Sequence, residues 1–252
     1  EYLDLNNWFG NNTKYFIIYI YIMNIYIILI LLLIFKIINE WTCKPNYNIN
    51  NRNCKYRDKI TKDGLFYKEN LLPYYEHKKL KDKYYKKYDT NTIEIDVNDT
   101  FLNNKNFINY LRKITKQPTL QLVNKNDKRQ AWLRYYDNNI KNLYELFHVD
   151  GKRYNCNAFQ YRVVYCIYNK SDASFITKKN NCKEIELPTK ENSLVIIEAE
   201  NLVHRVNFNK GCRLMLMADY TTDLNRGIHG NLVYVWDNIW FKLQKIISKL
   251  NI

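Results

Sequence analysis

A long apolar stretch lies near the start of the sequence, and short runs of alternating apolar and polar residues make up much of its second half. Residues 15–38 are almost entirely apolar, and the run from Tyr15 to Phe35 contains one polar residue, Asn24, and no charge. A helix needs about 20 such residues to cross a bilayer, whereas the apolar part of a signal peptide is shorter. The pattern predicts a single membrane-spanning anchor over residues 15–38, with a buried core helix or strand pair as the alternative.

A polar segment rich in lysine and tyrosine, residues 39–90, follows the anchor, and residues 1–14 precede the anchor as a flank. The basic stretch of the lysine-rich segment, residues 78–89, is more typical of a solvated helix face than of a phosphate-binding stripe with stacking tyrosines. We therefore expect a linker with helical character. His77 in this segment, and His229 in a glycine-flanked loop, are expected at the surface.

At about residue 91 the pattern changes to short strand-like runs, separated by Gly, Asn, Lys or Pro. A helix is expected before these runs, with Asp99 or Thr100 as its cap. Many short strands at regular spacing are typical of a β-sandwich or jelly roll. Residues 91–252 are therefore predicted to be one mainly β domain with flanking helices. The first helix should bury Phe107, Leu111 and Ile114, and a C-terminal helix should bury Val233, Trp236, Trp240, Leu243, Ile247 and Leu250.

Composition and charge change this picture little. The formal net charge is +14, but Lys, Asn, Ile and Tyr are abundant from one end of the chain to the other. The charge therefore reflects overall composition rather than a basic face, and nucleic acid is not an expected partner. The six cysteines include no CxxC pair, which excludes a zinc ribbon. Cys43 and Cys54 flank a polar loop and could pair in an oxidising compartment, and the alternative is that the cysteines are mostly reduced packing residues.

The candidate chemistry lies in four residues of the β domain. His148 and Asp150 are two residues apart, so on a strand both side chains point to the same face. His204 opens a later strand-like run and can approach from a neighbouring strand. Two imidazoles and one carboxylate are the ligand set of non-heme Fe(II) oxygenases. Arg213 lies in an apolar run, where a bidentate carboxylate would satisfy its guanidinium; a structural salt bridge is the alternative.

Residues 132–220 resemble the Fe(II)/2-oxoglutarate-dependent dioxygenase superfamily, and most closely its prolyl 4-hydroxylase-like branch. The matching text is WLRYYDNNIKNLYELFHVDG, QYRVVYCIYN and NSLVIIEAENLVHRVNFNKGCRLMLMADY. The resemblance implies a double-stranded β-helix, which is a jelly roll of the cupin type. It also implies that His148, Asp150 and His204 are catalytic ligands of Fe(II), and that Arg213 binds the distal carboxylate of 2-oxoglutarate.

Tyr136 resembles the family's tyrosine that also contacts 2-oxoglutarate, and Tyr165 on the next strand is a second candidate. The resemblance implies O2 as a co-substrate and ascorbate as an additional cofactor. The expected reaction is hydroxylation of a protein or peptide side chain, foremost a prolyl residue, with release of succinate and CO2. A Gly-Gly-Glu/Asp-Thr segment common in the family is replaced here by KSDASFITK, so the resemblance is weakest on the substrate-facing side.

Two other readings remain open from the sequence. An AlkB-like nucleic-acid demethylase would share the triad, with Arg226 as the only counterpart of that family's second arginine. A non-catalytic jelly-roll binding or structural protein would have no need of all four residues. The expected location is a membrane, crossed once. The lysines and arginines after the apolar run favour a catalytic domain on the cytosolic side of the membrane. The sequence alone leaves both sides of the membrane open for this domain.

Overall fold

The structure is a computed structural model that describes residues 19–34, 64–90, 92–124, 130–138, 147–148, 150, 154, 158–178, 184–199, 202–228, 230–232, 234–235 and 239. Residues 1–44 and residues 45–252 form two compact units. In the first unit, residues 19–34 are helical, and nearly all their apolar side chains are exposed. No helix within the described ranges is both long and apolar enough to cross a membrane.

The second unit is built mainly from β-strands, as predicted. Its described elements are β1 (Leu65–Lys68), α2 (Tyr74–Tyr84), β2 (Thr92–Glu94), the 3-10 turn η2 (Val97–Asp99), α3 (Lys105–Thr115), β3 (Gln121–Leu122), β4 (Trp132–Tyr136), β5 (Gln160–Ser171), β6 (Ser174–Lys178), β7 (Glu184–Pro188), β8 (Leu194–Glu198), β9 (His204–Asn207) and β10 (Gly211–Thr221). All the strand pairs are antiparallel.

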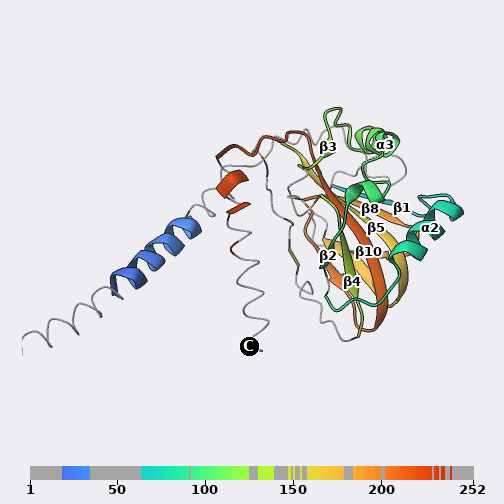
Figure 1. The fold of residues 1–252 in the computed structure, drawn as a ribbon, viewed down its shortest axis with the longest axis horizontal. Helices are drawn as coiled ribbons and strands as arrows, with labels where there is room; N and C mark the ends of the chain where they lie inside the picture. Colours follow the sequence, from blue (N-terminus) through green and yellow to red (C-terminus); the bar gives the residue numbers. More distant parts are fainter. Residues whose placement is uncertain are drawn as a thin grey trace, which may run out of the picture. The chain divides into compact units, whose positions relative to one another are not determined.

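The strands form a larger and a smaller sheet, and α2 and α3 cover one face of the larger sheet (Figure 1). The larger sheet has the order β1-β8-β5-β10-β4-β2, with β3 paired to β10, and the smaller sheet has the order β7-β6-β9. Strand β8 shows how the layers stack. Leu194 and Ile196 lie in the core beneath the helices, whereas Val195 and Ile197 pack with Phe175 of the smaller sheet. Because β8 is covered on both faces, it needs no exposed polar position.

Helix α3 agrees with the predicted helix except at its N-terminus. Its buried face includes Phe107, Leu111 and Ile114. The Asn104 side chain caps the helix by accepting a hydrogen bond of 2.8 Å from the Asn106 backbone N–H. Asp99 instead lies in the 3-10 turn η2, and Thr100 ends that turn. The prediction of Asp99 or Thr100 as the cap was wrong, because the chain makes this separate turn before the helix begins.

The lysine-rich segment predicted to be a linker contributes β1 and α2 to the second unit. Strand β1 pairs with β8, and α2 buries His77, Leu80 and Tyr84. His77 Nδ1 lies 2.7 Å from the Tyr165 hydroxyl, and Nε2 lies 3.1 Å from Glu191 Oε1. The surface prediction for His77 was therefore wrong. The lysines of α2 occupy its outer face and mask a narrow buried stripe at helical spacing.

Several predictions fall on residues outside the described part of the chain and stay predictions. They concern the ends of the anchor at residues 15–18 and 35–38, the pair Cys43 and Cys54, and His229. The same applies to the C-terminal apolar stripe formed by Val233, Trp236, Trp240, Leu243, Ile247 and Leu250.

Candidate metal centre

Backbone pairing brings the two separate parts of the predicted triad together. His148 and His204 form an antiparallel β-bridge with two reciprocal N–H to carbonyl hydrogen bonds, each 2.9 Å long. The Asp150 N–H donates to the Ala199 carbonyl at 2.8 Å, which fixes the chain two residues further along. The loop that carries the His-x-Asp pair is therefore attached to the segment between β8 and β9.

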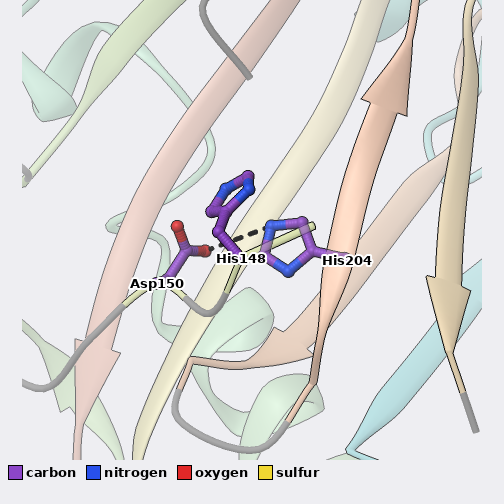
Figure 2. A group of neighbouring side chains, drawn as sticks. All are labelled: His148, Asp150 and His204. Carbon is purple, nitrogen blue, oxygen red and sulfur yellow. Dashed lines mark ion pairs between the residues drawn. The ribbon is translucent and has the colours of Figure 1, made fainter. Parts of the chain in front are cut away.

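The three side chains converge on one point (Figure 2). One donor atom from each of His148, Asp150 and His204 lies within 4.8 Å of the other two. Asp150 Oδ2 is 3.7 Å from His204 Nε2, and the two imidazole centroids are 4.5 Å apart. The structure thus assembles the predicted set of two imidazoles and one carboxylate.

His204 is held in the orientation that a metal ligand needs. Its Nδ1 lies 2.9 Å from the Leu202 carbonyl oxygen, so Nδ1 carries the proton and donates it. This tautomer leaves the Nε2 lone pair directed toward Asp150. Burial lowers the pKa of His204, although the Asp150 charge opposes this effect, so the ring is neutral at pH 7. Phe175 stacks on the ring with a centroid distance of 5.1 Å.

The donor set fits a divalent first-row metal bound through one face. Neutral imidazoles and a carboxylate suit Fe(II), and three protein ligands on one face leave the opposite coordination positions open. The two described cysteines, Cys166 and Cys212, are not part of this group. The residues therefore match the metal that the sequence predicts.

Arg162 and Asp219 support Asp150, and the sequence analysis missed both of them. Arg162 Nη1 contacts Asp150 Oδ1. Its Nε and Nη2 donate to the two oxygens of Asp219 at 2.8 and 3.0 Å. Arg162 and Asp219 are direct partners across the β5–β10 pair. A charge within an apolar run singled out Arg213, and the same signal could have found Arg162 in QYRVVYCIY and Asp219 in CRLMLMADY.

Arg213 lies on β10 directly opposite Tyr136 on β4, as expected if both line one site. Its guanidinium is 4.2 Å from the Tyr136 ring centroid and 6.0 Å from that of Phe208. Only 3% of Arg213 is exposed, and its Nε has no hydrogen-bond partner among the residues that the structure describes. No described carboxylate forms an ion pair with Arg213, so the salt-bridge alternative gains no support. A buried guanidinium in this state calls for an anionic ligand.

Tyr165 does not join Tyr136, and its assignment to 2-oxoglutarate gains no support from its position in the structure. Its ring is fully buried in the core beneath the helices. Its hydroxyl is 2.7 Å from His77 Nδ1 and 2.9 Å from Asn192 Oδ1. Alternate residues of β5 face the helices, and Tyr165 is one of them together with Val163. Its role is to attach α2 to the sheet.

No family model matches the sequence, and no curated protein matches it. Among solved structures, the chain is similar to the non-heme alpha ketoglutarate dependent epimerase SnoN from nogalamycin biosynthesis. The identity is 10%, the match covers 72% of this chain and 87% of that chain, and the TM-score is 0.50. At this identity the likeness shows the fold alone, which is consistent with the predicted jelly roll.

Two further solved structures are similar to the chain. An oxidoreductase of the 2OG-Fe(II) oxygenase family from Burkholderia pseudomallei is 10% identical, over 64% of this chain and 86% of that chain, with a TM-score of 0.48. A Pseudomonas putida prolyl-4-hydroxylase is 12% identical, over 62% and 84%, with a TM-score of 0.45. Scores below 0.5 add nothing to the argument on fold or substrate.

Proposed function

We propose that this chain is an Fe(II)/2-oxoglutarate-dependent dioxygenase. The observation that carries the proposal is the convergence of His148, Asp150 and His204 within 4.8 Å on a jelly-roll scaffold. These three side chains would hold Fe(II) through one face. When bound, Fe(II) and 2-oxoglutarate together supply O2 activation for oxygen insertion into an unreactive C–H bond, with succinate and CO2 as products.

The chain's own residues bind and orient the co-substrate. Arg213 would hold the distal carboxylate of 2-oxoglutarate in a bidentate contact, because its guanidinium is buried and no carboxylate among the described residues forms an ion pair with it. The Tyr136 ring supports the guanidinium from one side. Phe175 stacks on the His204 ring and covers one of its faces. These residues position the co-substrate beside the metal and keep the reacting atoms apart from bulk solvent.

We further propose that the substrate is a protein side chain, foremost a prolyl residue, and that residues 15–38 anchor the enzyme in a membrane. The substrate proposal is supported by the sequence resemblance of residues 132–220 to the prolyl 4-hydroxylase-like branch. The anchor is supported by the helix at residues 19–34, since its exposed side chains are almost all apolar. Burial of this surface in lipid is favourable at roughly 25 cal/mol per Å². Retention of the full chain in membranes after alkaline extraction tests the anchor, and release into the supernatant contradicts it.

A turnover assay on the full chain in detergent tests the reaction class. Succinate formation from 2-oxoglutarate is measured with Fe(II) and ascorbate, in the presence of proline-rich peptides or of methylated oligonucleotides. We expect turnover that depends on Fe(II) and is stimulated by the peptides. The His204→Ala variant is the control and should be inactive. Stimulation by the oligonucleotides alone would favour a demethylase, and full turnover by the variant would refute the metal assignment.

A further inference from the structure

A chain of three buried charged groups leads away from the metal centre. The side chains of Asp150 and Arg162 are each 8% exposed, and that of Asp219 is 1% exposed. Arg162 lies between the two carboxylates and contacts both of them. It is also covered by Trp132, whose ring centroid is 5.3 Å from the guanidinium carbon. Buried charges are costly unless they are paired, so the cluster acts as one electrostatic unit.

The geometry distinguishes the two oxygens of Asp150. Arg162 contacts Oδ1 through Nη1, whereas Oδ2 is the oxygen that lies 3.7 Å from His204 Nε2. The other edge of the guanidinium, Nε and Nη2, is taken by Asp219. Nη1 of Arg162 is directed to Asp150, whereas the bidentate fork of the guanidinium faces Asp219. One oxygen of Asp150 is fixed, and the other faces the imidazoles.

The charges of the cluster favour a metal ligand at Asp150. Two carboxylates share one guanidinium, so the three charged groups together carry one negative charge. A cation bound at Asp150 would balance that charge. Without the Asp219 carboxylate, the guanidinium could rotate and take both oxygens of Asp150, as arginine forks commonly do. Arg162 would then compete with the metal rather than support its ligand.

We propose that Arg162 and Asp219 are positioning residues that hold Asp150 with Oδ2 facing the metal. The inference rests on the proposed metal site, but it concerns metal affinity and does not depend on turnover or on the substrate. Groups that contact a metal ligand from outside typically change metal affinity by about 10–100-fold when they are replaced. Asp219 would influence the metal indirectly, by orienting Arg162. Arg162 would influence the metal by orienting the carboxylate of Asp150.

The test measures Co(II) binding to the full chain, because Co(II) is stable to air and its visible spectrum reports ligand geometry. The first variant, Arg162→Gln with Asp219→Asn, removes both charges together, so that neither residue leaves the other as an unpaired buried ion. The second, Asp219→Asn alone, leaves Arg162 free to take both oxygens of Asp150. We expect Co(II) affinity to fall by about 10–100-fold in both variants, with an altered Co(II) spectrum. Arg162→Lys retains the charge but cannot bridge both carboxylates, so we expect a smaller loss of affinity.

The matched control replaces another ion pair with neutral amides. Lys81 Nζ and Glu191 Oε1 form an ion pair of 2.6 Å on the helix-covered side of the larger sheet. The double variant Lys81→Gln with Glu191→Gln should lower the melting temperature without changing Co(II) affinity or the spectrum. A purely structural role for Arg162 and Asp219 would give this same result.

Unchanged Co(II) affinity and an unchanged spectrum in the Arg162 and Asp219 variants would overturn the inference. Weaker Co(II) binding in those variants supports it even if the wild-type chain turns over no 2-oxoglutarate, an outcome that would refute the proposed function alone. Absence of Co(II) binding to the wild-type chain would overturn the metal site and this inference together.

Discussion

Replacement of Arg213 by methionine should separate binding of the co-substrate from stability of the fold. Arg213 is 3% exposed, and no described carboxylate pairs with it. Its guanidinium contacts the Tyr136 and Phe208 rings. Methionine fills a similar elongated volume without a charge, so the variant removes the anion contact and keeps most of the packing.

The size of the binding effect follows from the contact that is lost. A bidentate guanidinium–carboxylate contact consists of two charge-assisted hydrogen bonds, each of which contributes at least about 1.5 kcal/mol. The loss is therefore about 3 kcal/mol, and at 1.4 kcal/mol per factor of ten the KM for 2-oxoglutarate should rise by about 100-fold. Arg213→Lys keeps the charge and loses the fork, so its KM should lie between those of the wild type and Arg213→Met.

The effect on stability has the opposite sign. Burial of an ion costs several kcal/mol, and the contact with Tyr136 recovers only about 0.5–2 kcal/mol of that cost. The melting temperature of Arg213→Met without co-substrate should therefore equal or exceed that of the wild type. A concentration of 2-oxoglutarate at 100 times Kd should stabilise the wild type by about 2.7 kcal/mol. The same concentration should stabilise the variant far less.

Differential scanning fluorimetry with and without 2-oxoglutarate, together with steady-state kinetics, measures both effects on the same samples. A lower melting temperature for the variant without co-substrate would mean that Arg213 is a structural residue. An unchanged KM, or an unchanged shift of the melting temperature by 2-oxoglutarate, would refute its role as the anion anchor.

Three further substitutions have distinct expected outcomes. His204→Ala should abolish stoichiometric metal binding in a Co(II) titration, because two ligands remain, and wild-type affinity would contradict the triad. Tyr165→Phe should lower the free energy of unfolding by about 1–3 kcal/mol, measured in urea, since His77 loses a buried partner; a raised KM for 2-oxoglutarate would restore the sequence-based assignment. Gly211→Ala should cost about 1–3 kcal/mol in the same experiment, because φ is 102° and the methyl group would collide with the Lys170 carbonyl, and unchanged stability would contradict this.

The sequence predicts the metal ligands because their chemistry is specific and their spacing is local. The spacing of His148 and Asp150 predicts a shared side if they lie on a strand, and the lone His204 follows a strongly apolar strand. Arg213 stands out because a charge in an apolar strand requires a partner. The mainly β domain follows from the many short runs, whereas the jelly roll of the cupin type is what the family resemblance implies. The structure supports the grouping of the triad and the pairing of Arg213 with Tyr136.

The sequence-based predictions were wrong or incomplete where the position of a residue depends on contacts between segments that are distant in the sequence. The face occupied by Tyr165 depends on the register between β5 and β10, which shifts at Leu214 and Met215. Such a shift changes which face of the sheet the following side chains of the strand point to, and the local sequence gives little sign of it. His77 is buried because α2 packs on the sheet, and the lysines around it conceal this. The contact between Arg162 and Asp219 could be predicted only if β5 and β10 were known to be paired strands.

Anaerobic addition of Fe(II) to the full chain with 2-oxoglutarate tests the central claim most directly. Binding of both Fe(II) and 2-oxoglutarate at this site should produce a visible charge-transfer absorption. We expect the absorption to saturate at one Fe(II) per chain and to be absent in His204→Ala. Absence of the absorption in the wild type, or an equal signal in His204→Ala, would contradict the assignment of a 2-His-1-carboxylate, 2-oxoglutarate-binding centre.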